Sequence, residues 1–508
     1  MKHRRILSGL AALMLAASLP MSALAREWDI ADGDITIVAD NDGQKVSQGT
    51  ENDISDDNPV IIGNSATNTV SIVAEKDRTA NVTLSGANID GSTKGNAAVS
   101  TTGEGNVSIE LDGDNTLKSG KGHAGLEKKN GGKLTIADED KNGKLTAEGG
   151  KYGAGIGGGD QGAGSGITIT GGEIKATGGQ YGAGIGGGKG DGSDITISGG
   201  EVNATGGTSG AGIGGGYNGN GSDITITDGE VNATGGKYGA GIGGGEYGIG
   251  KDIIITGGEV NATGGRFSAG IGGGSRGTGS DITISGGEVN ASGGVNGAGI
   301  GGGLRSKGKD ITVSGDTKLK VQGGDEDHYD GAGAGIGDGG SNAYGTKILG
   351  AEVEPDTSGL TTGRIEYYAP GADMDKDAPS QTIVGTYIPP QPAREAAAPA
   401  QPAAPLYRVT DGDGKDVSYE TTWRDGVLTV TVEADQATLT GRLSSIASLQ
   451  AQGIERIVFI TKGATSEFLT ADLLAAAPAT ERYALTHDGE TVTFTAGEAD
   501  VSGILVKA

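Results

Sequence analysis

A repeat of about 29 residues is the feature that most constrains how this chain can fold. Each copy contains the core GAGIG, written SAGIG once, and its isoleucines follow one another at 28 or 29 residues before a last interval of 36. These are Ile156, Ile185, Ile213, Ile242, Ile271, Ile300 and Ile336. A compact globule has no need of such a period, whereas stacked structural units require it. The repeat therefore predicts an array.

Three short strands separated by glycine turns are expected in each copy. Ile195 alternates with Ile197 across a polar residue, and Val202 with Ala204, a period typical of strands with one buried face. One coil cannot bury that face alone, but coils stacked about 4.8 Å apart place equivalent residues in columns. We expect a mainly β fold, a right-handed parallel β-helix of about 29-residue coils, in which the 103 glycines serve the turns.

The same register predicts columns of polar side chains on the outer surface. One consists of threonines, interrupted by Ile254, and one of asparagines. Two are acidic: Asp194, Asp223, Asp252, Asp281 and Asp310, and Glu173, Glu201, Glu230, Glu259 and Glu288. Like charges about 4.8 Å apart repel by nearly 1 kcal/mol even in water. Two interpretations stay open: the carboxylates are solvated and prevent sideways pairing, or the aspartates bind calcium, which prefers oxygen ligands.

Two further acidic segments are candidate metal sites. Residues 138–143 match the start of an EF-hand loop, with Asp138 and Asp140 as ligands, but Gly149 stands where that loop needs its bidentate glutamate. A simple turn is the alternative there. Asp325 and Asp327 lie in the insertion that lengthens the last coil, where a solvated loop is the alternative. Calcium is the one cofactor that these patterns suggest.

Aromatic residues recur at fixed places although they make up only 4% of the chain. Some precede the core and others follow it: Tyr152, Tyr181, Tyr238 and Phe267 before, Tyr217 and Tyr247 after. Beside a glycine strand without side chains they would form a flat strip suited to sugar rings, or they would simply cover the turns. Lys151, Lys237 and Arg266 stand just before the aromatics, which suits an acidic sugar.

Composition and motifs exclude several function classes. A formal net charge of −26 argues against nucleic acid as a partner. The sequence G-x-G-x-x-G recurs in almost every coil without a following helical pattern, so it is structural rather than a dinucleotide site. No nucleophile elbow, zinc-protease motif or Walker loop is present, and we expect no enzyme, with a polysaccharide lyase as the alternative.

The remaining segments predict an exported protein of several parts. Residues 1–25 read as a bacterial secretory signal peptide, which implies an extracellular location, and no later stretch is long and apolar enough for a transmembrane segment. Residues 26–121 are expected to form irregular first coils and a cap, and 122–345 the regular repeat. A β-rich connector over 346–388 and a Pro/Ala-rich linker over 389–405 lead to an α+β module at 406–508.

The run from Trp28 to Ile37, the run from Gly105 to Gly113 and the segment 122–126 before the GAGIGGG coils resemble a known family. They are similar to the secreted bacterial β-helix carbohydrate-binding domains, over about residues 26–345. The resemblance implies a pectate-lyase-like fold and binding of plant cell-wall polysaccharide, cellulose or pectin, without cleavage and with calcium. It names no ligand residues and leaves out the C-terminal module.

Together these features predict a secreted, non-catalytic polysaccharide-binding protein, assisted by calcium, that presents a flat Gly/Tyr face to glycans. The alternative is an adhesin-like stalk that displays the C-terminal module to a cell-surface partner.

Overall fold

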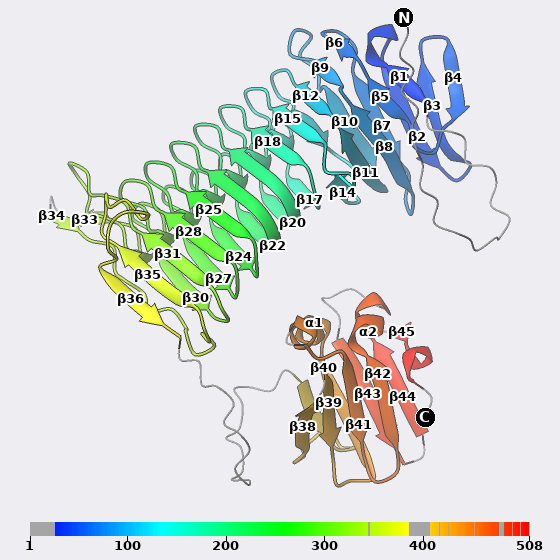
Figure 1. The fold of residues 1–508 in the computed structure, drawn as a ribbon, viewed down its shortest axis with the longest axis vertical. Coiled ribbons are helices and arrows are strands. Elements are labelled where there is room, and N and C mark those ends of the chain that lie inside the picture. The colour runs from blue at the N-terminus through cyan, green and yellow to red at the C-terminus, as the bar shows by residue number, and fades with distance from the viewer. Residues whose placement is uncertain are drawn as a thin grey trace, which may run out of the picture. The chain divides into compact units, whose positions relative to one another are not determined.

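The computed structural model describes residues 26–343, 346–385 and 407–506, the last range without residues 416, 425, 452, 477–481, 490 and 498. The signal peptide and the Pro/Ala-rich linker expected from the sequence lie outside the described residues. Two separate units are present, residues 1–390 and 391–508. The first is a parallel β-solenoid, which confirms the predicted fold class, and Figure 1 shows its coils stacked in sequence order from blue to yellow.

Each regular coil adds a strand segment to each of three faces, as the alternation of apolar residues predicted. The first face consists of β1 (Glu27–Asp29), β5 (Val60–Ile62), β8 (Thr79–Ser85), β11 (Asn106–Asp112), β14 (Leu134–Ala137), β17 (Gly164–Ile169), β20 (Gly192–Thr205), β22 (Gly221–Thr234), β24 (Gly250–Ile255), β27 (Gly279–Ile284) and β30 (Gly308–Val313). The strands pair in parallel and in register, residue above equivalent residue.

The second face continues from the first around a corner, and β20 and β22 run through both. Its other strands are β6 (Asn64–Ser65), β9 (Asn88–Asp90), β12 (Asp114–Lys118), β15 (Lys144–Glu148), β18 (Glu173–Thr177), β25 (Glu259–Thr263), β28 (Glu288–Ser292), β31 (Lys318–Gln322) and β35 (Arg364–Tyr368). The turn expected at residues 142–143 forms the corner between β14 and β15, which lie on different faces.

The third face carries the GAGIG cores. Its strands are β2 (Ile35–Asp40), β7 (Val70–Ala74), β10 (Val99–Gly103), β13 (Leu126–Lys128), β16 (Ile156–Gly157), β19 (Ile185–Gly186), β21 (Ile213–Gly214), β23 (Ile242–Gly243), β26 (Ile271–Gly272), β29 (Ile300–Gly301) and β32 (Ile336–Gly337). Every core isoleucine is fully buried, so the seven form a continuous column inside the solenoid. Burying one such side chain contributes about 1.5–3 kcal/mol.

Coils approach so closely at the core that only glycine fits after the isoleucine. Gly243 has a φ of 130°, a region that other residues avoid, and a Cβ there would lie 2.1 Å from the carbonyl oxygen of Gly272 in the next coil. The glycine period is therefore required by coil-to-coil contact.

Antiparallel strands cover both ends of the solenoid. At the N-terminal end η1 (Ile30–Asp32) precedes β2, and β3 (Gly43–Gln48) and β4 (Glu51–Ser55) pair antiparallel beyond it. At the other end β35 still pairs in parallel with β31, β36 (Gln381–Val384) pairs antiparallel with β35, and β33 (Ser341–Ala343) forms a hairpin with β34 (Thr346–Ile348). Residues 346–385 thus complete the solenoid, whereas the sequence had suggested a connector.

The second unit has two sheets around its own core. One contains β37 (Tyr407–Thr410), β40 (Gln436–Arg442), β43 (Arg482–Asp488), β44 (Thr491–Ala496) and β45 (Ala499–Asp500); the other contains β38 (Glu420–Arg424), β39 (Val427–Thr431), β41 (Arg456–Ile460) and β42 (Thr465–Leu469). The expected helix is α1 (Leu443–Ala451); α2 (Thr470–Ala476) and η2 (Ser502–Ile504) were not foreseen. Neither described α-helix is long and apolar enough to span a membrane.

A buried histidine lies in this second core. The His487 ring is fully buried, with Nδ1 3.0 Å from Thr461 Oγ1 and Nε2 2.8 Å from Ser466 Oγ. Burial lowers the pKa of His487 to about 4, so the ring is neutral at pH 7.

Candidate functional site

Two turns flank every GAGIG core, and they meet across coils. The turn that follows one core donates a backbone hydrogen bond to the turn that precedes the core of the previous coil. Tyr217 N–H donates to the Tyr181 carbonyl at 2.8 Å, and Ser275 N–H to the Tyr238 carbonyl at 2.9 Å. The glycines between the turns, such as residues 239–245, are buried. The expected bare glycine face is therefore wrong, because the meeting turns close over it.

The meeting of turns gathers the aromatic residues from both sides of the core. We call Tyr152, Tyr181, Tyr217 and Tyr247 the aromatic row. Their ring centroids lie 5.3, 5.6 and 6.2 Å apart in that order. Tyr238 and Phe267 form a separate stacked pair at 5.8 Å. All six predicted aromatic residues thus join ring clusters, and all are at least partly exposed.

The rings of the row do not share one plane. Tyr152 and Tyr181 stack at 20°, and coplanar rings could not approach to 5.3 Å, so each covers part of the other's face. The Tyr181 and Tyr217 planes meet at 72°, and those of Tyr217 and Tyr247 at 82°. The expectation of a flat strip is therefore wrong, because the four ring planes do not form one surface.

Six cations surround these rings. Lys121, Lys151 and Lys189 lie 5.5, 5.3 and 5.1 Å from the Tyr152 centroid. The other three cations lie beside rings as well: Lys237 is 4.8 Å from Tyr238, Arg266 is 5.0 Å from Phe267 and Arg276 is 5.9 Å from Tyr247. These distances allow cation–π attraction. We call the rings and these cations together the aromatic-cationic strip; in a chain of net charge −26 it concentrates positive charge locally.

Sequence reasoning found only half of these cations. Sequence analysis missed Lys121, Lys189 and Arg276. Each of them approaches a ring that lies in another coil of the solenoid, so spacing within one copy of the repeat does not bring the two together. Lys189 also lies 3.5 Å from the Asp160 carboxylate. The sequence does hold a signal for two of these cations, because Lys189 and Arg276 occupy the same positions after their GAGIG cores as Tyr217 and Tyr247 occupy after theirs.

The aspartate column lies on the first face and has a backbone explanation. Asp194, Asp223, Asp252, Asp281 and Asp310 all have φ between 50° and 55°, in the left-handed region that aspartate tolerates better than most residues. Glycine takes the same place one coil earlier, at Gly166 with φ 68°. Lys251 and Lys309 pair with Asp252 and Asp310 at 3.0 and 2.5 Å.

The glutamate and asparagine columns run along the second face. The glutamates end in lysines on both sides: Lys144 lies 2.5 Å from Glu173 and Lys318 lies 3.7 Å from Glu288. The asparagines form an amide ladder in which the side-chain NH₂ groups of Asn232, Asn261 and Asn290 donate to the amide oxygen of the coil before, at 2.8–3.1 Å. Hydrogen bonds between coils thus stabilise the asparagine column, whereas in the glutamate column, among the described residues, only the two end members pair with lysines.

One group of three acidic residues could hold a metal ion among the described residues. Glu110, from the coil below, joins the predicted Asp138 and Asp140, with one oxygen of each within 4.8 Å of the others. Asp138 accepts the backbone N–H groups of Asn142 and Gly143, both at 3.1 Å. Burial, together with the neighbouring acidic groups, raises the pKa of Glu110 despite a hydrogen bond from the Glu139 N–H. The site is thus a cation-compatible cluster of carboxylates.

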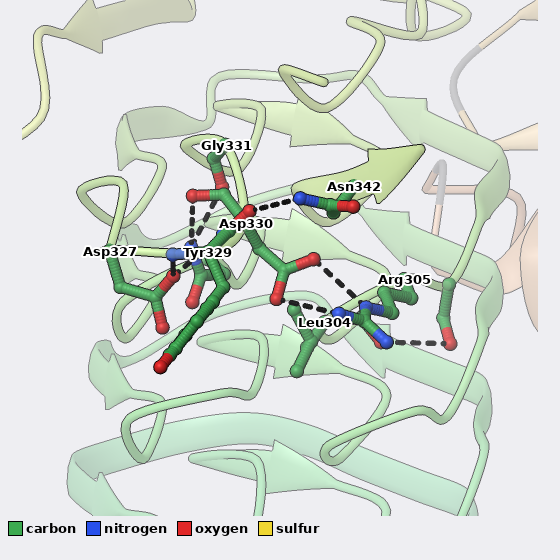
Figure 2. A network of polar contacts seen from close by, with 9 residues as sticks. Leu304, Arg305, Asp327, Tyr329, Asp330, Gly331 and Asn342 are labelled. Carbon is green, nitrogen blue, oxygen red and sulfur yellow. Dashed lines mark hydrogen bonds and ion pairs between the residues drawn. The ribbon is translucent and has the colours of Figure 1, made fainter. Parts of the chain in front are cut away.

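The acidic insertion of residues 325–330 is organised by hydrogen bonds within the protein (Figure 2). The buried Asp330 carboxylate receives two bonds from the Arg305 guanidinium, at 2.9 and 3.0 Å. Asp327 accepts the N–H groups of Tyr329 and Asp330 at 2.8 and 2.7 Å; burial opposes ionisation, but these bonds keep its pKa below the ordinary value. Asp325 does not join Asp327 in a group of three ligands among the described residues. The geometry is that of a folded turn.

Comparison with known proteins matches the solenoid alone. A model of the beta helix repeat matches residues 141–160, 167–189, 195–217, 224–246, 253–275 and 282–304, one match per coil. No curated protein matches the chain. No solved structure matches it either.

Proposed function

We propose that this chain is a secreted protein that binds an acidic polysaccharide along the aromatic-cationic strip, without cleaving it. The observation that carries the proposal is the placement of six cations within 6 Å of partly exposed rings on a strongly acidic chain. Rings offer apolar contact to sugar carbons, and ammonium or guanidinium groups attract carboxylate or sulfate groups on the same polymer. An acidic polymer would be repelled by most of the remaining surface, so the strip would also orient it.

The spacing of the strip supports a linear ligand. Successive coils advance by about 4.8 Å, and the row crosses several coils in one direction. A polymer with repeated charges could contact several coils at once, so that weak contacts add up along the chain.

Calcium belongs to the same proposal at Glu110, Asp138 and Asp140. Their three oxygens fit a hard cation that takes six to eight oxygen ligands, water supplying the rest. Bound there, calcium would offset two of the three negative charges of these carboxylates near the N-terminal end of the repeat and stabilise the corner between β14 and β15.

The test measures binding to soluble polygalacturonate, a sulfated glycan and neutral cellulose oligomers, each at low and high salt. The variant K151E/K189E removes two cations beside Tyr152 and should weaken acidic-glycan binding by about tenfold or more, since each charge contact contributes up to about 1 kcal/mol. Y181A tests the rings separately. K175E is the matched control, because Lys175 is exposed on the second face away from the row. Equal binding by wild type and K151E/K189E would contradict the proposal.

An adhesin-like stalk is the second candidate, favoured by the separate core of the C-terminal unit. If no glycan binds the full chain but a cell surface does, and deletion of residues 406–508 abolishes that binding, the stalk explains the protein better. Release of unsaturated sugar ends from polygalacturonate would instead establish a lyase.

A further inference from the structure

Among the described strands, β38 lies at one edge of the C-terminal four-stranded sheet. The strand order is β38-β39-β41-β42, and β38 pairs only with β39. Within the part of the chain that the structure describes, no strand pairs with the outer edge of β38. At the opposite edge the chain's own end is present, because Val506 N–H donates to the Glu467 carbonyl of β42 at 2.8 Å. An open edge of this kind is a place for pairing with another strand.

Trp423 lies on the core-facing side of this edge strand and is nevertheless 56% exposed. In the β38–β39 register Trp423 stands opposite Leu428, and Thr421 opposite Val430. Leu428 and Val430 are both buried, which identifies the side of the sheet that faces the core. The indole is exposed because the sheet ends at β38, so one more strand beyond it would cover the ring.

The sequence of β38 is complementary to itself in the antiparallel direction. It reads Glu-Thr-Thr-Trp-Arg from 420 to 424. If two copies pair about Thr422, Glu420 of each stands opposite Arg424 of the other, on the outer side of the sheet. Trp423 of each stands opposite Thr421 of the other, on the core-facing side. Opposite charges and an aromatic beside a β-branched residue are favourable cross-strand pairs.

We propose that a second copy of this chain pairs antiparallel with β38, which joins the two four-stranded sheets across a twofold axis. Such an interface uses the same patch on both copies and closes on itself. Only five residues per copy form the strand pair, so the interface is smaller than the standard 1,200–2,000 Å² and the dimer is weak. Charge complementarity of Glu420 and Arg424 selects a second copy over other strands.

The test is sedimentation of the full mature chain over a range of concentrations. The wild type should pass from monomer to dimer, with a blue shift of Trp423 emission as the ring becomes covered. E420R and R424E each place like charges opposite one another twice per dimer and should raise the dissociation constant at least tenfold. The double variant E420R/R424E restores opposite charges and should return to within about threefold of wild type.

R482E supplies the matched control, since it makes the same charge change on β43 in the other sheet. Circular dichroism of each variant checks that the module is folded. A wild type that stays monomeric at every concentration overturns the proposal. So does a folded double variant that dimerises no better than the single variants, because the pairing of Glu420 with Arg424 would then play no part.

Discussion

Substitution of Asp223 separates the two interpretations of the aspartate column. Asp223 has a φ of 52°, and the column shows the same left-handed conformation in five successive coils. If aspartate occurs there because the backbone is left-handed, Asn and Gly should preserve stability equally well, whereas a β-branched residue should lower it. If aspartate occurs there because it binds a metal ion, only the carboxylate should preserve stability.

The magnitudes follow from the geometry. A side chain in the left-handed region costs about 1–2 kcal/mol, and more for a β-branched residue, so D223V should lose about 2 kcal/mol of unfolding free energy. D223G removes that strain but adds about 0.5–1 kcal/mol of unfolded-state entropy, so it should stay close to wild type. D223N also removes repulsion from Asp194 and Asp252, a gain below about 1 kcal/mol that high salt should abolish.

Urea unfolding of the full chain gives the comparison, with W423F as background so that buried Trp28 alone reports the solenoid. T225V is the control, because Thr225 points outward from the same strand at an ordinary strand position and should change the midpoint little. The reasoning is refuted if D223V unfolds at the wild-type midpoint. It is also refuted if D223N and D223G are as unstable as D223V, because metal binding would then explain the aspartate column better.

Two further predictions concern titratable groups. Burial and acidic neighbours raise the pKa of Glu110, so the ionisation of Glu110 lowers the stability of the fold as pH rises. E110Q should therefore raise the melting temperature at neutral pH without calcium. Calcium should stabilise the wild type more than E110Q, and calorimetry with and without EDTA would measure both effects. The folded-state pKa of His487, about 4, lies below the ordinary 6.5. The C-terminal module should therefore lose about 3 kcal/mol of unfolding free energy as pH falls from about 6.5 to 4. H487Q should reduce this dependence on pH, as measured by urea titrations followed by Trp423 emission.

The sequence predicts the solenoid well because each residue's place in a coil depends on local period. Ile195 and Ile197, or Val202 and Ala204, point inward by alternation alone, and the structure buries all four. Coil stacking then follows from the repeat, and the beta helix repeat model matches six successive coils between residues 141 and 304.

Features that depend on contacts between unequal positions were not predicted. Tyr181 meets Tyr217, 36 positions later, because a turn of one coil bonds to a different turn of the next. Glu110 joins Asp138 from an irregular coil, where the 29-residue period gives no guide. The left-handed backbone at Asp223 was missed as well, since alternation predicts which way a side chain points but carries no information about φ.

The glycine contacts between coils also affect how the number of coils can change during evolution. Each regular coil meets its neighbours through the same backbone surfaces, as at Gly243 and Gly272, while the two ends are closed by separate antiparallel strands. Duplication or loss of one 29-residue unit would therefore leave every junction intact and neither end disturbed. Chain length can therefore vary in whole-coil steps. Within a coil, the intervals of 28 and 36 residues that keep Ile213 and Ile336 in register with the isoleucines of the preceding coils show that the turns also accommodate changes in length.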